Sequence, residues 1–181
     1  MKVKRILFLF CVVGFIGWCL WSCEPIRSYS KIPEIHFKRL VFEDKPPAPD
    51  LSDRRYAVIT FSFVDGDGNI GRSPQDTDSI SRVHYIWEKK LPEGIYEPYQ
   101  FQNESVTSAE IPYDKVMNKV DAYNKILKGT IDIEIEAPTE IQDIDTMRIG
   151  FYIVDRSRNK SNIDYTPDFS IQDPPTQPIT K

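Results

Sequence analysis

The residues of this chain that could hold a metal ion are concentrated in one short stretch. Asp65, Asp67 and Asn69 alternate along the sequence DGDGN, directly after an apolar run. Calcium loops use this spacing because a tightly turning backbone can point every second oxygen side chain at one cation. Counted from Asp65, Asp76 stands at position twelve, where calcium loops of the EF-hand type carry their last carboxylate. The spacing therefore predicts a low-affinity site for Ca²⁺ built from Asp65, Asp67, Asn69 and Asp76.

The same stretch also fits an interpretation without an ion. It is not an EF-hand, because Ile70 stands where that loop requires glycine and because the preceding element is a strand. Asp78 or Asp155 are alternative ligands for a looser site. Asp-Gly and Gly-Asn steps favour tight turns even without a cation, since glycine supplies positive φ and the Asx side chain caps the backbone. The sequence leaves both the ion site and the plain turn open.

Strands with alternating apolar residues must position this loop. The alternation is clearest at 56–64, 129–137 and 146–154, where every second residue is apolar. Their inward faces predict a core formed by Ala57, Ile59, Phe61, Phe63, Ile131, Ile133, Ile135, Ile149, Phe151 and Ile153. Weaker alternation or turn chemistry predicts further strands at 35–42, 82–89, 95–102, 108–112 and 163–171. Residues 113–128 fit either a helix or a loop with one helical turn.

About seven strands separated by turn-rich segments predict an all-β fold, an antiparallel two-sheet sandwich of the immunoglobulin-like type. We expect one domain at 33–172. Residues 173–181 contain three prolines and are expected to form a flexible tail.

The first residues carry the features of an export signal. Lys2, Lys4 and Arg5 precede an uncharged run at 6–21. This run is at or below the short end for a bilayer span, so an uncleaved membrane anchor is the less favoured alternative. We therefore predict a signal peptide at 1–22.

The residues that follow the apolar run, LWSC at 20–23, resemble the lipobox of bacterial lipoproteins. The resemblance implies cleavage before Cys23 and acylation of Cys23 by a fatty acid such as palmitate. Cys11 and Cys19 would be removed with the signal peptide, so the mature chain can form no internal disulfide. A lipidated tether is then expected at 23–32, and it would hold the protein on the membrane of a bacterial cell envelope.

Cleavage changes the net charge of the chain. The signal peptide takes three of the 23 basic residues, which leaves 20 against 27 acidic residues and a net charge of −7. That balance argues against a nucleic-acid partner and against a polybasic patch on anionic lipid.

Two stretches resemble a family of uncharacterised lipoproteins of Bacteroidota. FSFVDGDGNIG at 61–71 is similar to its strand-and-turn signature FxDxDGDIG, with Asn69 where the family often has a third aspartate. FYIVDRSRNKSNIDYTPDF at 151–169 is similar to its closing hairpin. The resemblance implies an immunoglobulin-like or fibronectin-III-like sandwich and implies no activity.

Two other groups of side chains offer binding surfaces. Asp132, Glu134 and Glu136 alternate along one strand; they form either a docking surface for a basic partner or, as we expect, a solvated face paired with lysine and arginine. Aromatic residues gather around the expected hairpin after residue 82. They could stack on sugar rings if exposed, but core packing is the favoured interpretation. These residues are Tyr85, Trp87, Tyr96, Tyr99 and Phe101.

No catalytic constellation is recognisable. His36 and His84 are the only histidines, each within an expected strand, and no nucleophile or phosphate-binding motif is present. We therefore expect a non-enzymatic envelope lipoprotein with a binding or structural role, on the outer membrane and facing either the periplasm or the cell surface. The alternative is a glycan-binding accessory lipoprotein that uses exposed aromatic residues. The sequence does not specify the partner, whether protein or glycan.

Overall fold

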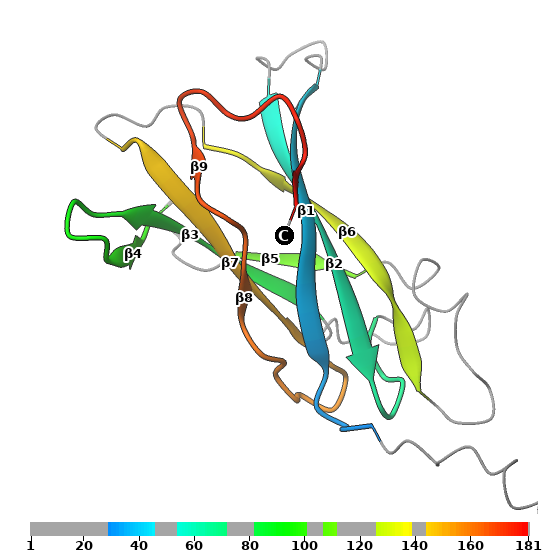
Figure 1. Ribbon diagram of the computed structural model, residues 1–181. Helices are drawn as coiled ribbons and strands as arrows, with labels where there is room; N and C mark the ends of the chain where they lie inside the picture. The colour runs from blue at the N-terminus through cyan, green and yellow to red at the C-terminus, as the bar shows by residue number, and fades with distance from the viewer. Residues whose placement is uncertain are drawn as a thin grey trace, which may run out of the picture.

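The computed structural model describes residues 29–45, 54–71, 82–100, 107–111, 126–138 and 144–180. The regular elements of these residues are strands, which form two antiparallel sheets packed as a β-sandwich (Figure 1). Within this described part, no helix has the length and apolarity needed to cross a membrane. The all-β sandwich predicted from the sequence is confirmed.

The first sheet has the strand order β10-β1-β2-β6. Its strands are β1 (Glu34–Lys45), β2 (Arg54–Asp65), β6 (Leu127–Glu136) and β10 (Ile179–Thr180). The second sheet is built around the pair β3 (Arg82–Lys90) and β7 (Thr146–Val154). Strands β4 (Tyr96–Pro98) and β5 (Thr107–Glu110) pair with β3, and β8 (Asp164–Tyr165) and β9 (Phe169–Ser170) pair with β7.

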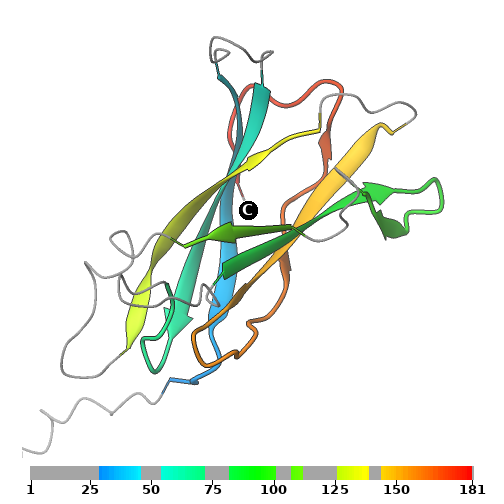
Figure 2. The same cartoon turned by 180° about the vertical axis from the view of Figure 1, so that it is seen from behind.

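The connections cross between the sheets in the immunoglobulin manner. Strands β1 and β2 are neighbours, the chain then crosses to β3, and it later returns to place β6 beside β2. It crosses again to place β7 beside β3, and β8 closes the second sheet. This order corresponds to strands A, B and E facing strands C, F and G of an immunoglobulin-type sandwich. Figures 1 and 2 show the two sheets from opposite sides.

The core lies between the two sheets. All ten residues predicted to be inside are buried, because side chains two apart on a strand face the same side. Phe151 is fully buried and its ring centroid lies 5.2 Å from that of Phe61 in the opposite sheet. Trp87 also belongs to this core, with 2% of its surface exposed.

Element boundaries differ from expectation where proline or an open sheet edge intervenes. Within the described part of the predicted hairpin strand, residues 95–100, only β4 is formed. The predicted strand at 163–171 is divided into β8 and β9 on either side of Pro167, which has no N–H to donate. The tail predicted to be loose instead ends in β10, whose Ile179 pairs with Leu40 of β1. Strand β10 covers part of the outer edge of β1, whose backbone N–H and C=O groups would otherwise lack a neighbouring strand. Of residues 113–128, whose sequence fits either a helix or a loop, residues 113–125 lie outside the described residues, and Leu127 and Lys128 belong to β6.

The closing segment, residues 161–166, pairs with its neighbouring strands largely through side-chain hydrogen bonds and not through a regular backbone ladder. Ser161 and Thr166 are buried, and their hydroxyl oxygens accept hydrogen bonds from the N–H groups of Ile153 (3.0 Å) and Ile149 (2.9 Å) of β7. Their own N–H groups donate to the carbonyl oxygens of the same isoleucines, each at 3.0 Å. Two-point pairing thus holds the segment on β7 although it forms only short strands.

The same segment also reaches the other sheet. The side-chain amide of Asn162 accepts from the N–H of Ile35 and donates to its carbonyl oxygen, each at 2.9 Å. The carboxylate of Asp164 accepts from the N–H of Phe37 at 2.6 Å. The start of β1 is therefore paired with polar side chains of the closing segment, which ties the two sheets together at the end where β1 begins.

Candidate metal centre

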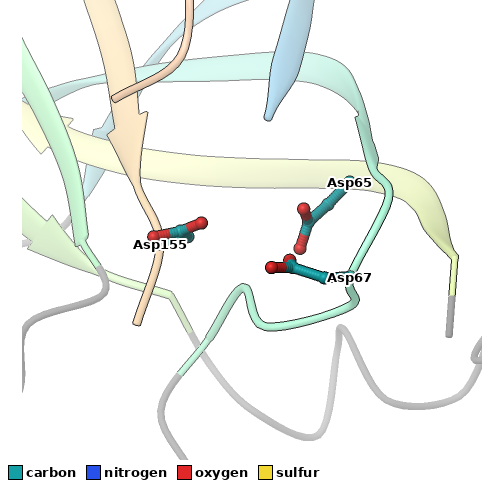
Figure 3. A group of neighbouring side chains, drawn as sticks. All are labelled: Asp65, Asp67 and Asp155. Carbon is teal, nitrogen blue, oxygen red and sulfur yellow. The ribbon is translucent and has the colours of Figure 1, made fainter. Parts of the chain in front are cut away.

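Three aspartates meet at one end of the sandwich. Asp65 is the last residue of β2, Asp67 lies in the loop that follows, and Asp155 comes directly after β7. Figure 3 shows the three side chains pointing toward one another. One carboxylate oxygen from each lies within 4.8 Å of the others. The structure thus brings together Asp65, Asp67 and the alternative ligand Asp155, whereas Asp76 lies outside the described residues.

Local hydrogen bonds shape the loop after β2. The N–H of Asn69 donates to Asp65 Oδ2 at 2.8 Å, which closes an Asx turn. Gly68 has a φ of 67°, a conformation that costs glycine little. Ile70 is buried with 1% of its surface exposed and so anchors the far side of the loop in the core.

Gly66 is required for a different reason, because the incoming chain passes beside it. Its N–H donates to the carbonyl oxygen of Ser30 at 2.9 Å. A Cβ at this position would lie 2.3 Å from that oxygen and 2.6 Å from the carbonyl oxygen of Tyr29. The segment that leads from the predicted tether into β1 therefore packs directly against the residue between Asp65 and Asp67.

The loop after β7 has the same hydrogen-bond pattern as the loop after β2. Asp155 Oδ1 accepts from the N–H of Asn159 at 2.7 Å, and Asp155 Oδ2 accepts from its side-chain amide at 2.8 Å. Arg158 has a φ of 67°, in the region rarely used by residues with a side chain. Both loops thus follow the pattern of an aspartate at a strand end with an asparagine four positions later.

The two loops also bond to each other. The side-chain amide of Asn69 donates to Ser157 Oγ at 2.8 Å. The carbonyl oxygen of Asn69 accepts from the backbone N–H of Arg156 at 3.2 Å and from its Nε at 3.0 Å. These bonds hold Asn69 at the junction of the two loops, with its N–H on the carboxylate of Asp65.

Several oxygens of the cluster lack a hydrogen-bond donor. Asp65 and Asp155 are fully buried. Among the described residues, no donor reaches the buried oxygens Asp65 Oδ1, Asp67 Oδ1 and Asn69 Oδ1. Leaving a buried polar atom unpaired costs about 1–3 kcal/mol, so each of these oxygens marks a place where a hydrogen-bond donor, a water molecule or a cation would bind.

The electrostatics agree with this geometry. Burial raises the pKa of Asp65 to about 6, the Asn69 N–H acts against this shift, and the charges of Asp67 and Asp155 add to it. Negative charge is therefore unfavourable at Asp65 unless a proton or a cation compensates it. The donors are carboxylate and amide oxygens, the ligands that Ca²⁺ and Mg²⁺ prefer, and the cluster offers none of the nitrogen or sulfur ligands typical of zinc.

The acidic stripe on β6 is a solvated, paired face. Asp132 accepts from the hydroxyl of Thr60 at 2.6 Å. Glu134 forms an ion pair with Lys45, and Glu136 forms one with Arg54 at 3.4 Å. The interpretation as a paired outward face, which the sequence favoured over a docking surface, fits these contacts.

The aromatic residues do not form a platform around Trp87. That side chain is buried and packs edge-on against Phe169, with ring centroids 6.2 Å apart. Tyr99 packs against the core, and the ring of Tyr96 lies 3.5 Å from the guanidinium carbon of Arg148. An exposed platform that includes Trp87 is therefore wrong, while Phe101 lies outside the described residues.

The histidines lie outside the aspartate cluster. His36 is exposed on β1 and bonds Glu34 at 3.1 Å. His84 stacks on Tyr152 with ring centroids 4.9 Å apart. Neither contributes to the group formed by Asp65, Asp67 and Asp155.

The fold and the aspartate cluster together define the class of protein: an all-β sandwich with three carboxylates gathered between two loops at one end. No protein-family model, curated protein or solved structure matches the chain. Membership of the Bacteroidota lipoprotein family stays a prediction from the sequence.

Proposed function

We propose that the protein is a lipid-anchored, non-enzymatic module of the bacterial cell envelope, with a binding or structural role. The observation that carries the proposal is the lipobox-like sequence ending in Cys23, six residues before the described chain begins at Tyr29. Six residues span at most about 20 Å. The end of the sandwich that holds Gly66 and Ser30 would therefore lie close to the membrane.

The non-enzymatic part of the proposal rests on the buried polar side chains of the described residues. Within the described residues, the buried polar side chains are Asp65, Asp155, Ser161 and Thr166. Ser161 and Thr166 are used to pair β7, and the aspartates have no histidine beside them to act as a base. We propose a binding or structural role on the outer membrane, facing the periplasm or the cell surface; this location follows from the predicted lipid anchor.

Mass spectrometry of the N-terminal peptide and membrane fractionation test the anchor. We expect the mature protein to begin at an acylated Cys23 and to sediment with membranes. Cys23→Ser should leave an unprocessed precursor that carries no lipid. Cys11→Ser, the matched control within the signal peptide, should still be processed. An unmodified Cys23, or retention of residues 1–22 in the wild-type protein, would overturn the proposal.

A glycan-binding role has less support, because it depended on an exposed Trp87. Trp18 and Trp21 precede Cys23, so Trp87 would be the only tryptophan of the mature protein. Burial in the core predicts blue-shifted emission and little quenching by iodide. Strong iodide quenching in the folded mature protein would instead restore the aromatic platform as a candidate surface.

A further inference from the structure

We propose that the oxygen cluster between the loops after β2 and β7 binds one divalent cation, and that this cation is Ca²⁺. The ligands are side-chain oxygens of Asp65, Asp67, Asn69 and Asp155. This inference goes beyond the proposed function, because a cation site in the sandwich does not depend on the lipid anchor.

The unpaired oxygens point to a cation independently of the acidic charge. Asp65 is fully buried, and its Oδ1 has no donor within the described part of the chain. The side-chain oxygen of Asn69 is also buried without a donor. A proton can neutralise a carboxylate, but an amide oxygen takes up no proton near neutral pH. A bound cation satisfies the carboxylate and the amide oxygens together.

The dimensions of the site fit calcium. Ca–O distances of about 2.3–2.6 Å place ligands on opposite sides of the ion about 4.6–5.2 Å apart. The three carboxylate oxygens lie within 4.8 Å of one another, so all three can contact one calcium ion. Calcium accepts six to eight oxygens in irregular geometry, so these four side chains with water complete its shell, whereas magnesium demands a near-ideal octahedron.

The ion would tie the two sheets at one end of the sandwich. Asp65 and Asp67 come from the end of β2, and Asp155 comes from the end of β7 in the opposite sheet. The hydrogen bonds from Asn69 to Ser157 and from Arg156 to Asn69 already bring the loops together. Binding should therefore stabilise the fold by linkage, without any change of secondary structure.

Calorimetric titration of the chelator-treated mature protein with CaCl₂, together with thermal unfolding, tests the site. Three carboxylates and an amide place the expected dissociation constant on the order of 10⁻⁴ M. The thermal midpoint should rise by a few degrees in millimolar Ca²⁺ and fall back with chelator. If the midpoints coincide and no heat is released, the cluster binds no cation and the proposal fails.

Variants identify the ligands. Asp155→Asn should abolish the calcium-dependent rise, whereas Asp132→Asn, on the solvated face of β6, should leave it intact. Each variant is first compared with the wild type without calcium. Asp155→Asn also loses one of the two hydrogen bonds that Asp155 accepts from Asn159, so Asp67→Asn is the second variant. Asp67→Asn removes a repelling carboxylate outside that turn, so its calcium-free midpoint should equal or exceed that of the wild type, and loss of its calcium response is not loss of folding. A full calcium response in Asp155→Asn would overturn the ligand set.

Asn69→Asp tests whether the side-chain oxygen of Asn69 or its amide nitrogen faces the carboxylates. If the oxygen of Asn69 faces the ion, the added charge should lower the dissociation constant several-fold. If the amide nitrogen instead donates to the carboxylates, the fourth negative charge should lower the calcium-free midpoint and leave calcium affinity unimproved. The second result would remove Asn69 from the site.

Discussion

The carboxylate of Asp155 lies beside that of Asp65, although the two residues stand at the ends of strands in different sheets and lie far apart in the chain. Each aspartate is fully buried, and each accepts the N–H of an asparagine four positions further on. The pair therefore forms only when the sheets have packed correctly, so a cation bound there would report on the packing of the whole domain.

Gly66→Ala should detach the entering chain from the end of β2. The new Cβ would meet the backbone oxygens of Ser30 and Tyr29 at 2.3 Å and 2.6 Å, so the backbone must move. We expect a loss of about 1–3 kcal/mol in the free energy of unfolding and faster amide exchange across residues 29–33. Ile32→Ala is the control, because it shortens an exposed side chain of the same segment and keeps the Ser30 carbonyl that accepts from Gly66. Unchanged exchange in Gly66→Ala would contradict the contact.

Asn162→Ala should destabilise the fold more than its exposed position suggests. The side-chain amide makes both hydrogen bonds to the buried Ile35, and alanine leaves these backbone groups unpaired. We expect a loss of about 1–3 kcal/mol in urea unfolding. Asn162→Asp keeps the acceptor and should lose less, and the neighbouring Ile163→Ala should change little. Equal stability of Asn162→Ala and the wild type would disprove this pairing.

Phe151→Ala should be the most damaging of these substitutions. The ring is fully buried and packs on Phe61 of the opposite sheet, so its loss leaves a cavity between the sheets. We expect a loss of about 3–5 kcal/mol in the free energy of unfolding. The exposed Lys38→Ala should stay within about 0.5 kcal/mol of the wild type. A loss below 1 kcal/mol for Phe151→Ala would mean that the core is not packed in this way.

The stability should depend on pH through His84. Burial lowers the pKa of His84 below 6.5, and the charges of Arg82 and Lys160 lower it further, while the uncharged Tyr152 stacks on the ring. The folded state therefore binds the proton less tightly than the unfolded state. The stabilisation is present above pH 6.5 and is lost as the pH falls below it. The stability difference between wild type and His84→Gln should shrink over that range, and a constant difference would argue against the effect.

The sequence predicted the sheets because local periodicity determines which residues face inward. The alternation around Phe61, Ile133 and Phe151 placed these side chains in the core correctly. Periodicity failed to predict the structure of residues 163–171. Side-chain hydrogen bonds replace the backbone ladder there, so apolar residues do not alternate regularly. Periodicity also failed at Ile179, because pairing with a distant strand edge has no local pattern.

The candidate site was predictable in part for the same reason. Asp65, Asp67 and Asn69 lie on one loop, so their spacing alone shows that they can converge. Asp155 could be placed beside them only by knowing that β2 and β7 end at the same end of the sandwich. A usable signal was the repeated spacing of Asp65 to Asn69 and of Asp155 to Asn159, each at the end of a strand.

Anomalous diffraction from crystals of the mature protein grown with millimolar Mn²⁺ tests the cation site most directly. Manganese accepts the same oxygen ligands as calcium and gives a measurable anomalous signal. We expect one peak between the two loops, within about 2.6 Å of side-chain oxygens of Asp65, Asp67, Asn69 and Asp155. Ordered loops with no anomalous peak between them would contradict the account.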